Sequence, residues 1–217
     1  MKVALVLSGC GVFDGTEIHE AVLTLLALVR AGAEVEFLAP DINQSRVINH
    51  VTGQVSEGET RNVLVEAARI ARGKVKNIAE AVSSDYAAIF FPGGFGAATN
   101  LSDFASKGAD CRIQEDVMRF AKSAADASIP ACYICIAPTM IPLVYGPATR
   151  VTIGTDEDTA NAITSMGGLH VPCPVNDYVI DEVRKVVSTP AYMLAQHIAE
   201  AATGIDAAVA ATLALIR

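Results

Sequence analysis

Apolar and polar positions follow two recurring patterns along the chain. Short runs of consecutive apolar residues are typical of strands buried on both faces of a sheet, and they occur at 2–7, 34–39, 86–91, 130–135, 151–153, 169–175, 178–181 and 185–188. Other segments carry apolar residues at helical spacing: 18–30, 61–72, 111–127, 156–166, 193–202 and 205–216, with a further helix expected between 135 and 145. Residues 41–58 are polar and irregular, which predicts a loop or a short hairpin.

Strands that alternate with helices in this way predict a parallel sheet with helices on both faces. No linker or repeat interrupts the alternation, so we expect one domain over residues 1–217. Ligands of such sheets bind beyond the carboxyl ends of the strands. That rule directs attention to the loops after Leu7, Phe91 and Cys135.

Composition and charge narrow the class of protein. The chain is 52% hydrophobic and 18% charged, which excludes a disordered protein. A formal net charge of -8 argues against binding to nucleic acid or to an anionic membrane surface. Residues 127–149 carry no full charge, but four prolines interrupt them, so we interpret them as a buried strand and helix rather than a membrane span. The first apolar run, 2–7, is too short for a signal sequence.

The cysteines indicate a reducing environment. Five of them are scattered along the chain, an odd number in a protein large enough to build its own core, so we expect no disulfide framework. We therefore expect a cytoplasmic protein. No spacing typical of zinc ligands occurs, and we expect no metal and no cofactor.

Cys135 stands where a strand ends and a helix begins at once. Pro138 suits the first turn of that helix, because its missing N–H would have no partner there. This arrangement resembles a nucleophile elbow, in which a sharp turn exposes the side chain above the sheet. A helix N-terminus also favours the thiolate, so we expect a lowered thiol pKa. The alternative is a buried structural cysteine.

Two glycines follow the preceding strand. Gly93 and Gly94 permit a turn whose N–H groups face the neighbouring strand end, and an oxyanion hole needs such donors beside the amide of the residue after the nucleophile, here Ile136. Taken alone, these glycines are equally consistent with an ordinary turn. Glu17 begins the first helix at the same edge and forms a capping-box spacing with Asp14. If Glu17 kept its proton, it could donate a hydrogen bond to a Cys135 thiolate.

Two other motifs are weaker. Cys132 and Cys135 form a C-x-x-C, but their odd spacing along a strand points them to opposite faces, which disfavours a redox pair. The loop 8–15 resembles a dinucleotide-binding loop, but Asp14 stands where that motif needs glycine.

The motifs together resemble a known superfamily. Residues 92–98 (Pro-Gly-Gly-Phe-Gly-Ala-Ala), 135–138 (Cys-Ile-Ala-Pro) and Glu17 resemble the class I glutamine-amidotransferase-like superfamily, which includes the parkinsonism-associated deglycase. Residues 8–15, 19–22, 155–156 and 189–194 are similar to the ElbB-like isoprenoid biosynthesis glyoxalases, and this resemblance covers essentially the whole chain. It implies a flavodoxin-like three-layer sandwich, a homodimer, and conversion of glyoxal to glycolate without metal or glutathione.

The resemblance also implies residue roles. Cys135 would be the nucleophile, Glu17 its acid/base partner, and Gly93, Gly94 and Ile136 would bind the substrate oxygen. Amidotransferases and the deglycase place a histidine near the cysteine, whereas the helix after Cys135 contains none.

The missing histidine bears on the reaction. Amide hydrolysis must protonate a poor leaving amine, a task for histidine, whereas glyoxal conversion has no such leaving group. We therefore expect a small dicarbonyl substrate, with His50 and His170 as the histidines that could still assist. The alternatives are a redox sensor that oxidises Cys135 reversibly and a binding or chaperone-like protein. The apolar composition also predicts a homodimer.

Overall fold

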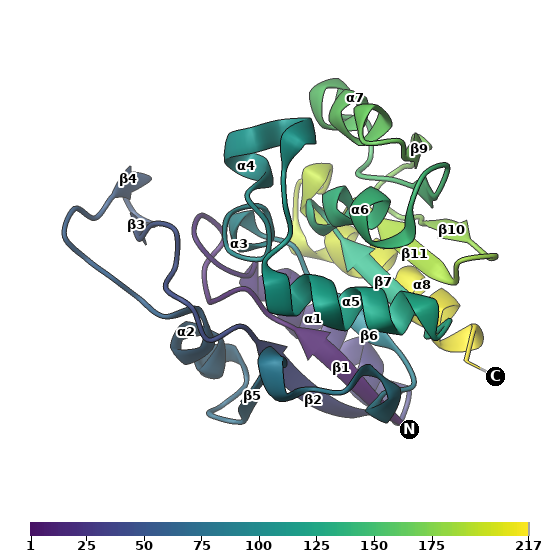
Figure 1. Cartoon of the computed structure of the whole chain (residues 1–217), viewed down its shortest axis with the longest axis horizontal. Coiled ribbons are helices and arrows are strands. Elements are labelled where there is room, and N and C mark those ends of the chain that lie inside the picture. The colour runs from purple at the N-terminus through teal and green to yellow at the C-terminus, as the bar shows by residue number, and fades with distance from the viewer. Residues whose placement is uncertain (217) are drawn as a thin grey trace.

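A seven-stranded sheet forms the centre of the computed structural model, which describes residues 1–216 (Figure 1). Its strands are β1 (Lys2–Val6), β2 (Glu34–Ala39), β5 (Val75–Asn77), β6 (Ile89–Phe91), β7 (Ala131–Ile134), β10 (Val179–Asp181) and β11 (Val186–Thr189). Their order in space is β10-β11-β7-β6-β1-β2-β5. All neighbours run parallel except β10 and β11.

Helices cover both faces of this sheet. They are α1 (Ile18–Arg30), α2 (Val63–Ile70), α3 (Phe95–Thr99), α4 (Phe104–Lys107), α5 (Glu115–Asp126), α6 (Ile141–Tyr145), α7 (Glu157–Ser165) and α8 (Ile198–Ala214), with 3-10 turns η1 (Ile78–Glu80), η2 (Ser83–Asp85), η3 (Gly108–Asp110), η4 (Ala137–Met140) and η5 (Ala191–Met193). Side chains of α5, α6 and α7 pack in one apolar core, and those of α1, α2 and α8 in the other. The predicted three-layer α/β arrangement with a mostly parallel sheet is confirmed.

Two small sheets stand apart from the central one. The polar segment contains a hairpin of β3 (Ile48–Asn49) and β4 (Gln54–Val55), as the sequence allowed. The predicted strands at 151–153 and 169–175 are only β8 (Arg150–Val151) and β9 (Leu169–His170), which pair with each other. They are too short to extend the main sheet.

The C-terminal region differs from the sequence prediction. Two closing helices were expected on either side of Gly204, but α8 runs through it. A Cβ on Gly204 would lie 2.3 Å from the carbonyl oxygen of Val175, so this glycine allows α8 to approach the chain closely rather than ending the helix. Strand β5 was not predicted at all, since it is a short edge strand without an apolar run.

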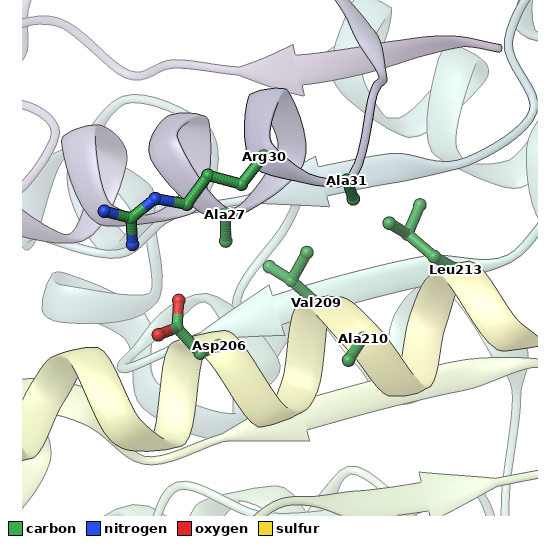
Figure 2. Close-up of a pocket in the computed structure, with 7 residues that line it drawn as sticks. All are labelled: Ala27, Arg30, Ala31, Asp206, Val209, Ala210 and Leu213. Atoms are coloured by element: carbon green, nitrogen blue, oxygen red, sulfur yellow. The ribbon is translucent and has the colours of Figure 1, made fainter.

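Helices α1 and α8 lie side by side on the sheet. Figure 2 shows the shallow hollow between them, lined by Ala27, Arg30, Ala31, Asp206, Val209, Ala210 and Leu213. The hollow lies at the C-terminal end of α1, so it is remote from the carboxyl ends of the strands, where α1 begins. Within residues 1–216, no helix combines the length and the apolar content that crossing a bilayer requires.

Candidate active site

Cys135 occupies a strained turn directly after β7. Its φ is 62°, a left-handed conformation that costs a residue other than glycine roughly 1–3 kcal/mol. Its N–H donates to the carbonyl oxygen of Thr189 at 3.0 Å, which ties the turn to the neighbouring strand β11. The chain then enters η4, whose first turn contains Pro138. The backbone thus has the geometry expected of a nucleophile elbow.

The Cys135 side chain is more enclosed than the sequence indicated. We expected a thiol facing solvent at the rim, but the residue is 8% exposed. The N–H groups of Gly94 and Ile136 point at its sulfur, each as a hydrogen-bond donor that favours the thiolate. These two amides are the ones expected to form an oxyanion hole, and the structure brings both to the sulfur.

Glu20, one turn into α1, is the carboxyl that meets the thiol. It is 0% exposed, and the carboxyl and the Cys135 thiol each shift the pKa of the other. Gly93 lies between them: a Cβ there would be 2.5 Å from the Cβ of Cys135 and 2.9 Å from Oε2 of Glu20. A side chain at position 93 would therefore separate the pair.

Backbone donors hold the Glu20 carboxyl in place. The N–H of Gly93 donates to Oε2 at 3.0 Å, and the N–H of Tyr192 donates to Oε1 at 3.2 Å. Gly93 was expected among the groups that bind the substrate oxygen, but its N–H faces Glu20 instead. Its place in the site is to fix the carboxyl beside the sulfur.

Glu17 lies at the cavity wall and not on the thiol. Its carboxylate accepts from the N–H of Glu20 at 2.7 Å and so caps α1. The predicted capping box of Asp14 and Glu17 is not formed: Asp14 is buried in its loop, where Oδ2 accepts from the N–H of Ile48 at 2.7 Å. The helix begins at Ile18 as predicted, but Glu17 is its N-cap and its carboxylate turns to the N–H of Glu20, so Glu20 rather than Glu17 lies beside Cys135.

The ionisation of the pair also differs from expectation. Burial, together with the charge of Glu17, raises the pKa of Glu20 from its ordinary 4.5 to about 8, against the opposing donors Tyr192 and Gly93. Burial raises the pKa of the Cys135 thiol as well, and the carboxyl of Glu20 adds to this, while the amides of Gly94 and Ile136 lower it. Both groups therefore hold their protons at neutral pH. The expected resting thiolate is corrected because desolvation outweighs the helix N-terminus.

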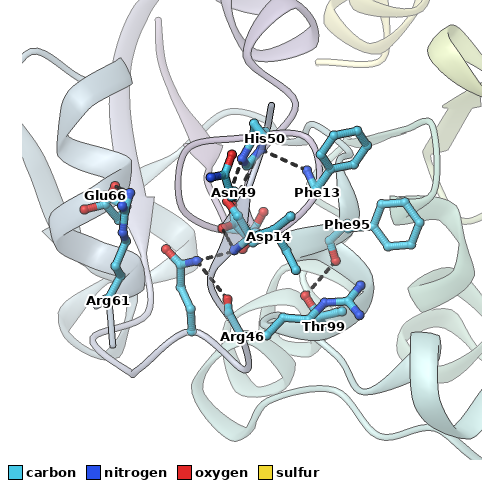
Figure 3. Close-up of polar contacts among 12 residues, drawn as sticks. Phe13, Asp14, Arg46, Asn49, His50, Arg61, Glu66, Phe95 and Thr99 are labelled. Atoms are coloured by element: carbon cyan, nitrogen blue, oxygen red, sulfur yellow. Dashed lines mark hydrogen bonds and ion pairs between the residues drawn. The ribbon is translucent and has the colours of Figure 1, made fainter. Parts of the chain in front are cut away.

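The two histidines that were expected to assist, His50 and His170, lie elsewhere, whereas His19 contacts the hydroxyl of the cavity-lining Tyr192 through Nδ1 at 2.9 Å. His50 accepts from the N–H of Phe13 through Nε2 at 3.2 Å, and its Nδ1 is 3.0 Å from the carbonyl oxygen of Ile48, so it joins the β3–β4 hairpin to the loop after β1 (Figure 3). Nε2 of His170 accepts from the N–H of Ile153 at 3.3 Å, and burial lowers its pKa. Neither lines the cavity at Cys135.

A cavity of about 400 Å³ opens in front of the sulfur. It is lined by Val12, Glu17, Gly94, Phe95, Ala98, Phe104, Ala105, Cys135, Ile136, Asp156, Thr159, Tyr192 and Met193, and no histidine is among these described residues. Over residues 1–216, no cluster of His, Cys, Asp or Glu side chains has the arrangement of a metal site. The cavity therefore offers the Cys135 sulfur, two amide donors and the carboxyls of Glu17 and Asp156, while the fully buried Glu20 carboxyl lies next to Cys135 and outside the lining.

The other cysteines are not part of this arrangement. All five are free thiols. Cys132 is fully buried in the core that packs with α1, α2 and α8, where burial raises its pKa to about 12. Cys10 lies on the loop after β1 and does not line the cavity.

Comparison with known proteins identifies relatives along nearly the whole chain. The human glutamine amidotransferase-like class 1 domain-containing protein 3, mitochondrial, is 48% identical over 201 residues, which cover 88% of this chain and 75% of that protein. The rat ES1 protein homolog, mitochondrial, is 45% identical over 223 residues, covering 99% of this chain and 84% of that protein. No family model matches the chain.

Solved structures agree with these relatives. An isoprenoid biosynthesis protein with an amidotransferase-like domain from Ehrlichia chaffeensis superposes with a TM-score of 0.93, at 34% identity and 100% coverage of both chains. Glyoxalase III from Candida albicans has a TM-score of 0.60 at 14% identity, covering 100% of this chain and 98% of that one. The second likeness shows the shared flavodoxin-like fold alone.

The relatives correct the expected compartment. The human and rat proteins are both named as mitochondrial, which points to mitochondria and away from the cytoplasm. Free cysteines and negative charge indicate only a reducing environment, so they could not distinguish between compartments. By its identity to these proteins over nearly its full length, the chain belongs to the ES1 family of glutamine amidotransferase-like class 1 domain proteins.

Proposed function

We propose that the protein is a cysteine-dependent glyoxalase that converts glyoxal to glycolate without a metal or glutathione. The observation that carries the proposal is a cavity lined by Cys135, Gly94 and Ile136, with the buried Glu20 carboxyl adjacent to the Cys135 thiol. The fold shared with a glyoxalase III and the near-complete overlap with an isoprenoid biosynthesis protein are consistent with it.

The first step forms a carbon–sulfur bond. The sulfur of Cys135 adds to one aldehyde carbon, and the thiol proton passes to the carbonyl oxygen, giving a neutral hemithioacetal. The amides of Gly94 and Ile136 stabilise the charge that develops on that oxygen. Because the thiolate is the nucleophile, the thiol must lose its proton as the carbon–sulfur bond forms, and that proton ends on the carbonyl oxygen.

Glu20 then moves protons between the two carbons. Its carboxyl takes the proton from the carbon bonded to sulfur and gives one to the second carbonyl oxygen, forming an enediol. A second exchange places a proton on the other carbon and leaves a thioester, which water hydrolyses to glycolate and the free thiol. One carbon is oxidised and the other reduced, so no external oxidant is needed. A carboxyl with a pKa of about 8 both gives and takes protons readily near neutral pH.

The absence of a leaving amine separates this reaction from amide hydrolysis. Glutaminase and protease chemistry needs a group that protonates nitrogen, and no histidine is found among the described residues of the cavity wall. Burial of the Cys135 thiol also weighs against a redox sensor, since such sensors rely on exposed thiols of low pKa.

The test is glyoxal consumption and glycolate formation followed by NMR. The wild-type protein and Cys10→Ala are expected to produce glycolate at similar rates, and Cys135→Ala none. Cys10→Ala is the matched control because it removes a thiol outside the cavity. Turnover by Cys135→Ala, or its loss in Cys10→Ala, would contradict the proposal.

A further inference from the structure

The cavity in front of Cys135 is far larger than glyoxal. Its volume of about 400 Å³ falls within the range of roughly 300–1,000 Å³ of pockets that enclose drug-sized ligands. Glyoxal, with two carbons, would occupy only the part beside the sulfur. Much of the remaining wall is apolar: Phe95 and Ala98 of α3, Phe104 and Ala105 of α4, and Met193 of η5.

The apolar wall is already in place without a ligand. The N–H of Phe95 donates to the carbonyl oxygen of Val12 at 2.8 Å, and its ring lies 5.8 Å from the guanidinium of Arg46 (Figure 3). The ring is nevertheless 47% exposed, a large apolar surface at the cavity. An apolar group that covered it would gain affinity from desolvation.

The charged groups of the cavity wall are acidic. Donation from the side chain of Thr159, together with its N–H at 2.8 Å, lowers the pKa of Asp156 and keeps it ionised at neutral pH. Glu17 lies at the same wall. None of the described residues that line the cavity is basic. An anionic substrate would therefore meet negative charge at the wall itself, since the nearby Arg46 contacts the ring of Phe95 and does not line the cavity.

We propose that the preferred substrate is a neutral α-oxoaldehyde with an apolar substituent larger than methyl, about the size of a phenyl ring or a short alkyl chain. The aldehyde carbon lies at Cys135, and the substituent lies between Phe104, Ala105 and Met193. This inference rests on the proposed glyoxalase function and specifies its substrate class.

The reaction follows the same steps as that of glyoxal. The substrate differs from glyoxal only in that the apolar substituent replaces one aldehyde hydrogen. Sulfur bonds to the aldehyde carbon, the proton on that carbon moves by way of the enediol to the ketone carbon, and water cleaves the thioester. The aldehyde carbon is oxidised to a carboxylate and the ketone is reduced to an alcohol, so the product is a 2-hydroxy acid. Only water is consumed.

The test compares kcat/KM for glyoxal, phenylglyoxal and an alkyl α-oxoaldehyde whose chain ends in a carboxylate. Burial of the phenyl ring is expected to raise kcat/KM for phenylglyoxal roughly 10- to 100-fold above that for glyoxal. The carboxylate-bearing compound is expected to fall below an uncharged one of equal length. Each product is identified as the corresponding 2-hydroxy acid.

Substitutions in the cavity wall test where the apolar substituent of the substrate lies. Ala105→Phe fills the apolar part at an exposed position of α4, so the fold tolerates it, and the preference for phenylglyoxal over glyoxal is expected to fall at least tenfold. Phe104→Ala, which removes the facing ring, is expected to lower the same preference. Ala127→Phe introduces the same ring at an exposed position after α5 and is expected to leave both rates unchanged.

The outcomes separate this inference from the proposed function. Cys135-dependent turnover of glyoxal with no preference for phenylglyoxal would overturn the inference and leave the glyoxalase proposal standing. A preference that neither Ala105→Phe nor Phe104→Ala alters would also overturn it. If no dicarbonyl is converted at all, the proposed function itself fails.

Discussion

The buried Glu20 carboxyl should make stability depend on pH in a way that one substitution removes. A pKa raised from 4.5 to about 8 means that, between these values, the folded protein keeps a proton that the unfolded chain has lost. Stability from this group is therefore full below pH 4.5 and declines as the pH rises to 8. At about 1.36 kcal/mol per pKa unit, the total loss is about 5 kcal/mol.

Glu20→Gln isolates this contribution, because glutamine has nearly the same shape and does not titrate. The free energy of unfolding of both proteins is measured by urea titration from pH 5 to pH 8. Glutamine leaves one of the donors Gly93 and Tyr192 poorly paired, which lowers stability by an amount that does not depend on pH. The advantage of the wild-type protein over Glu20→Gln is expected to shrink by about 1.4 kcal/mol per pH unit.

Thr24→Ala is the matched control. Thr24 is buried one turn further along α1, where its hydroxyl donates to the carbonyl oxygen of Glu20 at 2.7 Å, and it does not titrate. Its cost is expected to be the same at every pH. A constant difference between wild type and Glu20→Gln would refute the buried neutral carboxyl, and a difference that grew with pH would show that Glu20 is ionised in the folded protein.

Three further predictions follow from other parts of the molecule. Thiolate absorbance of Cys135, obtained by subtracting the Cys135→Ala titration, should appear only above the ordinary thiol pKa of 9.0, because burial opposes the charge; a midpoint below neutral pH would contradict this. Gly204→Ala should destabilise the protein by about 1–3 kcal/mol in urea unfolding, since the new Cβ meets the carbonyl of Val175, whereas exposed Thr203→Ala should have little effect. The protein should sediment as a homodimer, because Ile18, Val22, Leu26 and Val29 form an exposed apolar stripe on α1, and a concentration-independent monomer would refute this.

The elbow and its amides could be anticipated because local sequence determines them. An apolar run ending at Cys135, with Pro138 soon after, specifies a strand followed by a helical turn. The glycines after β6 likewise indicate a tight turn at the same edge. Parallel topology then brings the two loops together.

The carboxyl partner could not be chosen from sequence with the same reasoning. Glu17 and Glu20 are three residues apart and share one face of a helix, so either could approach the sulfur. The signal that favours Glu20 is its spacing from Thr24 and Leu28, which are both buried on the sheet side. That spacing becomes decisive only once the Glu17 carboxylate is seen to cap the helix on the N–H of Glu20, which leaves Glu20 beside Cys135.

The burial of the Cys135 thiol could not be predicted from the sequence either. It accompanies the packing of Gly93 against Cys135 and of Glu20 against Gly93 and Tyr192, contacts between segments far apart in the chain. The predicted lowering of the thiol pKa considered the helix N-terminus alone. The desolvation that opposes it depends on packing that a single segment does not reveal.

The most direct test of the Cys135–Glu20 pair is the rate of glycolate formation in Glu20→Gln and Glu17→Gln, measured beside the wild-type protein. Glu20→Gln should lower kcat by roughly 10²- to 10⁴-fold, as expected for the loss of a general acid/base, while the protein remains folded. Glu17→Gln leaves the carboxyl at the sulfur in place and should retain kcat within about tenfold. Wild-type turnover in Glu20→Gln, or a greater loss in Glu17→Gln, would contradict the assignment of proton transfer to Glu20.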